Sequence, residues 1–304
     1  MAFTAQDVKT LREMTNVGMM DCKAALTATD GDMDKAVDWL REKGLAKAAK
    51  KADRIAAEGV AYATVIGGVG VVIEVNAETD FAAKTDAFMD LVKNLAEVVA
   101  TQNPADVDAL KACTYPGSNL TVTEIMQEKV MSIGENMQIR RFDRFAENTN
   151  VAYVHAGGSH GVLVSLAVEG DIDVTEIGKN VAMQIAAMGA KYWDKELVPQ
   201  AEVDKELSVQ LALMDNDPKM ASKPAAVKEK IAAGKIEKFY EENCLLQQTF
   251  VKDNDVTVEK YIANASKGAV KFLDAIRFER GEGIEKKQDN FAEEVAAQIA
   301  GAAK

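Results

Sequence analysis

The feature that most constrains the fold of this chain is an internal duplication, in which two segments match at a spacing of 91 residues. The matching pairs are Val60-Ala61-Tyr62 with Val151-Ala152-Tyr153, Gly67 with Gly158, Gly70 with Gly161, and Val71-Val72-Ile73 with Val162-Leu163-Val164. Each copy predicts a β-hairpin, because a strand-like segment, a glycine turn and a strongly apolar segment follow one another. The chain should therefore contain two related α+β halves, each a small antiparallel sheet with helices on one face.

Each predicted hairpin is followed by a helix and a closing strand. Apolar residues recur at helical spacing in both copies, at Phe88, Leu91, Val92, Leu95, Val98 and Val99, and again at Ile177, Val181, Ile185 and Met188. The closing strands echo one another as Arg141-Phe142-Asp143-Arg144 and Arg277-Phe278-Glu279-Arg280. We expect the two halves to span residues 55–146 and 147–285.

The two copies differ in length between the hairpin and the helix. The hairpins match at a spacing of 91 residues, whereas the helices match at 86, as Lys93 with Lys179. The first copy therefore carries five extra residues, which fall within Asn76–Ala83. A loop insertion in one copy of a duplicated scaffold is a natural place for function.

The N-terminal segment, residues 1–54, predicts a three-helix unit followed by a basic linker. Leu11 and Met14 lie on the first helix, Asp21 is the expected N-cap of the second, and Gly44 is expected to end the third. The Ala-rich, mostly basic stretch 47–54 predicts a solvated helical linker, although contact with an acidic partner surface is an alternative.

The second half contains an insertion at about 195–243 that predicts an antiparallel helical hairpin. Its expected seam consists of Val203, Leu207, Gln210 and Met214 on one helix and Val227, Ile231, Ile236 and Phe239 on the other. Pro218 and Pro224 bracket the turn. A C-terminal helical module, residues 286–304, has Phe291, Val295 and Ile299 in register and either packs on the body or binds a partner.

Charge and composition exclude several classes of protein. The net charge is −12, and nucleic-acid binding normally needs a basic face, so a direct nucleic-acid role is disfavoured. No apolar run approaches the roughly 20 residues that span a bilayer, and the first residues lack the features of a signal peptide. We therefore expect no membrane contact and a cytoplasmic location.

Residues for catalysis or metal binding are scarce. His155 and His160 flank a glycine turn without a third ligand nearby, which favours exposed turn residues over metal ligands. The run Gly67–Gly70 lacks the ending of a phosphate loop and predicts a hairpin turn. The three cysteines are far apart in the sequence, which favours a role as small buried hydrophobic residues over disulfides or a zinc site. No catalytic residue, cofactor or metal is expected.

Several long motifs, in order along the chain, resemble the elongation factor Ts family, whose members are guanine-nucleotide exchange factors of elongation factor Tu. The motifs are Leu11–Thr15 with Gly18–Leu26, Glu74–Phe81, Ile133–Asn136 with Ile139–Arg141, and Arg277–Lys286. The resemblance covers essentially the whole chain. It implies that the N-terminal unit is similar to ubiquitin-associated domains, and that the partner is elongation factor Tu, a GTPase.

The resemblance also implies which residues act on that partner. Thr79, Asp80, Phe81 and Ala82 belong to the family's intrusion loop, in which Asp80 and Phe81 insert near the Mg²⁺ and phosphate region of the partner. Taken alone, the residues favour a different role, in which Asp80 caps the following helix and Phe81 packs on its first turn. The resemblance and the insertion favour the partner-binding role.

Arg12, Met19 and Met20 are the partner-binding residues that the resemblance implies in the N-terminal unit. Adjacent residues on a helix cannot both face one core, so at least one of the two methionines should be exposed. Two rival functions remain: an interaction or chaperone-like module without exchange activity, and an enzyme. Self-association, through the helical hairpin, stays open.

Overall fold

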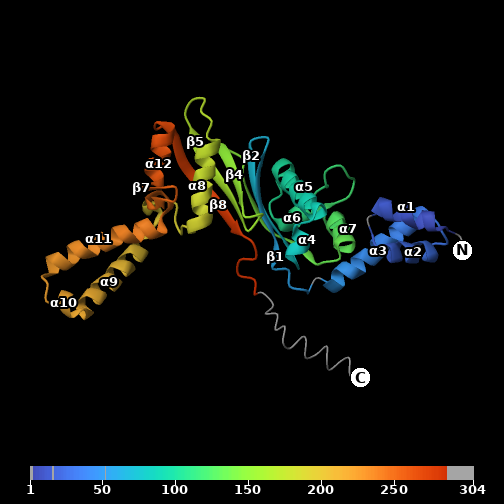
Figure 1. Ribbon diagram of the computed structural model, residues 1–304, viewed down its shortest axis with the longest axis horizontal. Coiled ribbons are helices and arrows are strands. Elements are labelled where there is room, and N and C mark those ends of the chain that lie inside the picture. Colours follow the sequence, from blue (N-terminus) through green and yellow to red (C-terminus); the bar gives the residue numbers. More distant parts are fainter. Residues whose placement is uncertain (1–2, 16, 52, 286–304) are drawn as a thin grey trace, which may run out of the picture. The chain divides into compact units, whose positions relative to one another are not determined.

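The computed structural model describes residues 3–15, 17–51 and 53–285, and it is an α+β protein in which N-terminal helices precede antiparallel sheets and further helices (Figure 1). The chain divides into two compact units: residues 1–61, 74–141 and 279–304 form the first, and 62–73 and 142–278 form the second. The domain boundaries predicted from the sequence repeat stay predictions. The predicted C-terminal helix lies outside the described residues.

The chain begins with three helices, as predicted: α1 (Ala5–Thr15), α2 (Met19–Ala28) and α3 (Met33–Lys51). They share a small core of buried side chains, made of Val8, Leu11, Val17, Cys22, Ala25, Leu26, Ala36 and Leu40. The apolar spacing of these residues therefore places one face of each helix against the others.

Two details predicted for these helices are wrong. Gly18, not Asp21, occupies the N-cap position of α2, so Asp21 lies within the first helical turn. Gly44 does not end α3, which continues to Lys51. A Cβ atom at Gly44 would lie 2.0 Å from the Met131 sulfur, so the glycine leaves room for close packing against helix α7 (Val122–Ile133) rather than stopping a helix.

The first sheet has the strand order β1-β2-β3. Its strands are β1 (Glu58–Ile66), β2 (Val69–Ala77) and β3 (Met137–Phe145). Gly67 and Gly68 connect β1 to β2 with φ angles of 58° and 86°, which is the left-handed geometry that a two-residue hairpin turn requires. Between β2 and β3 the chain forms α4 (Asp80–Ala83), α5 (Asp86–Gln102), α6 (Val107–Ala112) and α7. The predicted apolar stripe of α5 is fully buried.

The second sheet repeats this arrangement with the order β4-β5-β8. Its strands are β4 (Thr149–His155), β5 (His160–Val168) and β8 (Val270–Glu279). The β4–β5 pair is antiparallel, with Val151 opposite Val164 and His155 opposite His160. Helix α8 (Thr175–Met188) follows β5 and buries Val181 and Ile185 in the core of this unit.

The predicted helical hairpin is present. Helices α9 (Gln200–Asn216) and α11 (Ala225–Asn243) lie side by side, joined by the short α10 (Pro218–Ala221) (Figure 1). Met214 and Ile236 are buried in its seam, as expected, but Val227 is exposed. Lys228, the residue after Val227, makes a 2.6 Å ion pair with Asp215 of α9, so the two helices also share a polar contact.

The remaining elements belong to the second unit. These elements are the 3-10 helices η1 (Lys195–Leu197) and η2 (Leu245–Gln247), the strands β6 (Thr249–Phe250) and β7 (Asp253–Thr257), and α12 (Val258–Ser266). Among the described residues, none of the helices combines the length and apolar character that a bilayer span demands.

Candidate functional site

The loop that follows β2 forms a single helical turn, α4, whose shape is set by a cap. The Thr79 hydroxyl accepts a hydrogen bond from the Ala82 backbone N–H at 3.2 Å. Ala82 and Ala83 are buried beneath the turn. The alternative in which Asp80 caps the helix is wrong, because Thr79 does so and Asp80 is the first helical residue.

Phe81 is the main apolar group that this turn presents to solvent. Its side chain is 80% exposed, so the alternative in which it packs on the first helical turn is also wrong. Full burial of a Phe side chain is worth about 1.5–3 kcal/mol. The isolated chain forgoes that free energy, and a partner with a suitable pocket could recover it.

Asp80 carries a negative charge beside this phenyl ring. The Lys84 ammonium lies 2.5 Å from the Asp80 carboxylate, and its hydrogen bond lowers the pKa of Asp80 below the ordinary value. The Lys84 side chain is 71% exposed and the Asp80 side chain is 43% exposed. The turn therefore presents an apolar ring next to a carboxylate that stays ionised at neutral pH.

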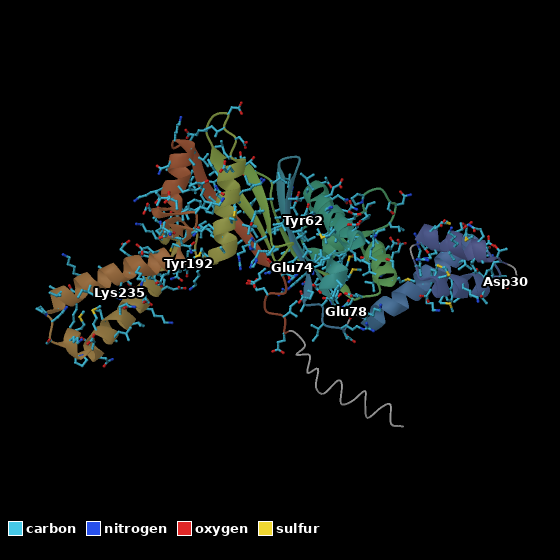
Figure 2. All side chains as sticks on the ribbon, viewed as in Figure 1. Asp30, Tyr62, Glu74, Glu78, Tyr192 and Lys235 are labelled. Carbon is cyan, nitrogen blue, oxygen red and sulfur yellow. The ribbon has the colours of Figure 1, made fainter. Side chains whose placement is uncertain are left out.

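Two further carboxylates hold the base of this loop. Glu135, between α7 and β3, accepts hydrogen bonds from the Thr79 backbone N–H at 3.0 Å and from the Thr79 hydroxyl at 2.6 Å. Glu78, labelled in Figure 2, accepts one from the Asn136 backbone N–H at 2.6 Å. Both residues lie within motifs that resemble the family, but no local pattern predicts these contacts, because the partners are more than 50 positions apart.

Glu74, also labelled in Figure 2, is a fully buried carboxylate in β2. Its oxygens accept hydrogen bonds from Arg140 at 2.9 Å, Arg141 at 2.7 Å and the Gly281 backbone N–H at 2.8 Å. This arrangement joins β2, β3 and the segment after β8 within the first unit. Since its hydrogen-bond partners all belong to the first unit, the buried carboxylate stabilises the packing of these segments.

The predicted residues of the N-terminal helices lie at the surface. Met19 and Met20, at the start of α2, are 52% and 76% exposed, and Arg12 on α1 is also exposed. The expectation that at least one methionine would be exposed is therefore confirmed. Met14 is a further exposed methionine that the sequence analysis placed only on a helix. Flexible, polarisable methionines suit an adaptable binding surface.

Within the described part of the chain, no group of three or more His, Cys, Asp or Glu side chains is placed to hold a metal ion. His155 and His160 face each other across the β4–β5 turn, as register partners. Burial raises the pKa of the Cys244 thiol to about 11, so this thiol stays protonated and is a poor nucleophile. These groups offer little to covalent chemistry.

Comparisons with known proteins agree on one family. The family model described as "Elongation factor TS" matches residues 78–282. An elongation factor Ts of Clostridium kluyveri is 45% identical over 307 aligned positions, covering 98% of this chain and 99% of that protein. An elongation factor Ts of Magnetococcus marinus is 43% identical and covers 99% of this chain and all of that protein. On these matches, which run through both units and through the capped turn after β2, the chain belongs to the elongation factor Ts family.

Proposed function

We propose that this chain binds elongation factor Tu in its GDP form and speeds GDP release by inserting Asp80 and Phe81 near the Mg²⁺ and phosphate region of that partner. The observation that carries the proposal is the 80% exposure of Phe81 on a capped turn whose neighbouring alanines are buried. Glu135 holds the base of the turn through Thr79, and the Phe81 ring and the Asp80 carboxylate remain accessible to a partner.

Membership of the family supplies the coarser function. The chain is a guanine-nucleotide exchange factor of elongation factor Tu, and not an enzyme. It therefore acts in translation elongation, in the cytoplasm, which was the location expected from the sequence. The proposal concerns the finer question of which residues act on the partner and how.

The two residues of the turn have complementary effects on the bound nucleotide. The Phe81 ring acts as an apolar wedge that gains free energy on entering a pocket of the partner. The Asp80 carboxylate brings negative charge to a region that holds phosphates, and it offers an oxygen ligand of the kind that Mg²⁺ prefers. Both effects weaken the hold of the partner on GDP without any covalent step.

The wedge needs help from other contacts. Burial of one Phe yields about 1.5–3 kcal/mol, whereas a thousandfold faster release needs about 4 kcal/mol. We assign the additional binding to Arg12, Met19 and Met20 on the N-terminal helices, which are exposed and therefore accessible. These residues keep hold of the partner while the turn acts.

The finer division of the chain belongs to the same proposal. It consists of a module similar to ubiquitin-associated domains with its linker at 1–54, the two α+β halves at 55–146 and 147–285, and a C-terminal module at 286–304. The helical hairpin at about 195–243 belongs to the second half, and its seam serves internal packing unless the hairpin also contacts the partner or a second copy of the chain.

The test is the release of a fluorescent GDP from elongation factor Tu, with the unchanged chain and with its Phe81→Ala and Asp80→Ala variants. Phe81→Ala should slow the stimulated release by about 10- to 100-fold, the equivalent of the burial energy of one Phe. The rival function, an interaction module without exchange, predicts release at the same rate for all three proteins and would replace the proposal if that result were obtained.

Reciprocity provides a second readout in the same assay. If the chain lowers the affinity of elongation factor Tu for GDP, then GDP lowers the affinity of elongation factor Tu for the chain by the same factor. Added GDP should therefore dissolve a nucleotide-free complex of the two proteins. A complex that survives saturating GDP contradicts the exchange mechanism.

A further inference from the structure

Two carboxylates, one from each of the paired segments, fix the base of the turn that carries Phe81. Glu78, on the loop, accepts from the Asn136 backbone N–H, while Glu135, on the turn between α7 and β3, accepts twice from Thr79. We refer to Glu78, Thr79, Glu135 and Asn136 as the Glu135 clamp. Hydrogen bonds to a charged carboxylate are roughly twice as strong as neutral ones, so the clamp is a firm connection.

Glu135 also controls the cap of the turn. A threonine hydroxyl has one hydrogen to donate and two lone pairs to accept with. The Thr79 hydroxyl donates its hydrogen to Glu135, which leaves its lone pairs for the Ala82 backbone N–H, 3.2 Å away. A chain of contacts therefore runs from Glu135 through one hydroxyl to Ala82, the residue directly after Phe81.

The same connection between α7 and β3 holds the end of the N-terminal helices. The Asn136 side chain donates to the Arg54 backbone carbonyl at 2.8 Å, and the Lys51 ammonium donates to the Gly134 carbonyl. The Arg54 guanidinium also lies 3.5 Å from the Glu78 carboxylate. Residues 134–136 are therefore a junction at which the end of α3 and the base of the Phe81 turn are attached together.

We propose that Glu135 is a positioning residue for nucleotide exchange, which holds the Asp80–Phe81 turn in its working geometry relative to the end of α3. This inference rests on the proposed function of that turn. Without the clamp the turn must be ordered at the moment of docking, and this ordering subtracts from the useful binding energy. A displacement of about 1 Å in a working group can lower a rate by about 100-fold.

The first experiment compares Glu135→Ala with a matched control at the start of α7, the helix that precedes Glu135. Glu124, at the start of α7, accepts from the Thr121 backbone N–H and hydroxyl, both at 2.8 Å, which is the same pair of contacts that Glu135 makes with Thr79. Glu135→Ala should lower the maximal rate of stimulated GDP release by roughly tenfold, and Glu124→Ala should leave it within about twofold. Equal rates for Glu135→Ala and the unchanged chain would overturn the inference.

The conservative variant Glu135→Gln gives a graded readout. A glutamine carbonyl can still accept from the Thr79 N–H, and its amide can donate to the hydroxyl, so part of the rate should return.

Hydrogen exchange of the backbone amides of residues 79–82 should be faster in Glu135→Ala, with the amides of α1–α3 unchanged. Faster exchange throughout the chain would show a general loss of stability and would overturn a positioning role.

A double-mutant cycle separates the inference from the proposed function. If Glu135 acts only through the turn, then Glu135→Ala lowers the rate by a smaller factor once Phe81→Ala is present, because only Asp80 is left to position. Losses that simply multiply would overturn the inference while leaving the wedge intact. A Phe81→Ala variant with full activity would instead refute the wedge, and with it the purpose of the clamp.

Discussion

The two hairpin–helix repeats of this chain differ most in the connection between strand and helix. In the first repeat, residues 78–85 follow β2 and form a capped turn with Phe81 80% exposed. In the second repeat, residues 169–174 lead from β5 to α8, and their exposed apolar residue is Ile172, at 38%. The strands β2 and β5 begin 91 residues apart, so the scaffold before each connection is the same.

The difference shows how a duplicated scaffold acquires a working part in one copy. Thr79 and Thr85 each cap a helix start with a side-chain hydrogen bond, so the first connection contains two helix starts. Val174, at the same point before α8, makes no such bond. Helices α5 and α8 end 86 residues apart, at Gln102 and Met188, but they begin 89 residues apart, at Asp86 and Thr175, so α5 is three residues longer at its start. The five extra residues therefore lengthen the connection and add to the start of α5.

The comparison would be broken most directly by exchanging the connections. Replacing residues 78–85 with the six residues Glu169–Val174 removes the turn and its half of the Glu135 clamp, while the helices α1 and α2 remain. We expect stimulated GDP release to fall by roughly 100-fold or more, because wedge and positioning are lost together. Stopped-flow release of fluorescent GDP measures the effect, and thermal unfolding checks that the chimera is folded.

A control from the second repeat makes this result specific. Ile172→Ala changes the exposed apolar residue of the other connection and should keep the release rate within about twofold, since no part of the proposed site lies there. A folded chimera that retains more than about a tenth of the rate would contradict the assignment of function to the first connection.

The central strands provide the second comparison. Glu74 in β2 and Ser165 in β5 stand 91 residues apart and are both buried, but only Glu74 carries a charge, held by Arg140 and Arg141. Glu74→Ala should lower the free energy of unfolding by about 3 kcal/mol, because it leaves two arginines without their buried partner. Ser165→Ala should lower it by about 1 kcal/mol or less. Urea unfolding measures both, and similar values would contradict the distinction.

The pH dependence of stability sharpens the same comparison. Burial by itself raises the pKa of Glu74, but hydrogen bonds from Gly281, Arg140, Asn76 and Arg141 outweigh it, so the net pKa is lowered. A lowered pKa stabilises the folded state above the unfolded pKa of about 4.3, and this stabilisation is lost as the pH falls through the folded pKa. The unchanged chain should therefore lose more stability on acidification than Glu74→Gln, and parallel losses would contradict this sign.

The smallest expected effect concerns the charge at the tip of the first connection. The Lys84 ammonium lowers the pKa of Asp80, whose side chain is partly exposed to solvent. Lys84→Ala should raise the pKa of Asp80 toward its ordinary value of about 3.9. An NMR titration of the Asp80 carboxylate measures the shift. An unchanged pKa would show that solvent already screens the pair, and Asp80 would then face the partner without help from Lys84.

Much of the fold could be predicted from local patterns. The helical spacing of Phe88 through Val99 located α5, the glycines at 67 and 68 located a hairpin turn, and Pro218 and Pro224 bracketed the connection of the helical hairpin. These features depend on residues a few positions apart. The prediction that Gly44 ends α3 is wrong for the same reason, because this glycine accommodates Met131, which is distant in sequence.

The sequence by itself determined the duplicated scaffold, the place of the insertion and the family, since repeats, spacing and motifs are properties of the linear order of residues. Tertiary structure alone decided that Phe81 points into solvent, that Thr79 rather than Asp80 caps its turn, and that Glu135 holds Thr79. The physical reason is that exposure and hydrogen bonding depend on which surfaces meet. Thr79 and Glu135 are 56 positions apart and come together only when the first unit folds.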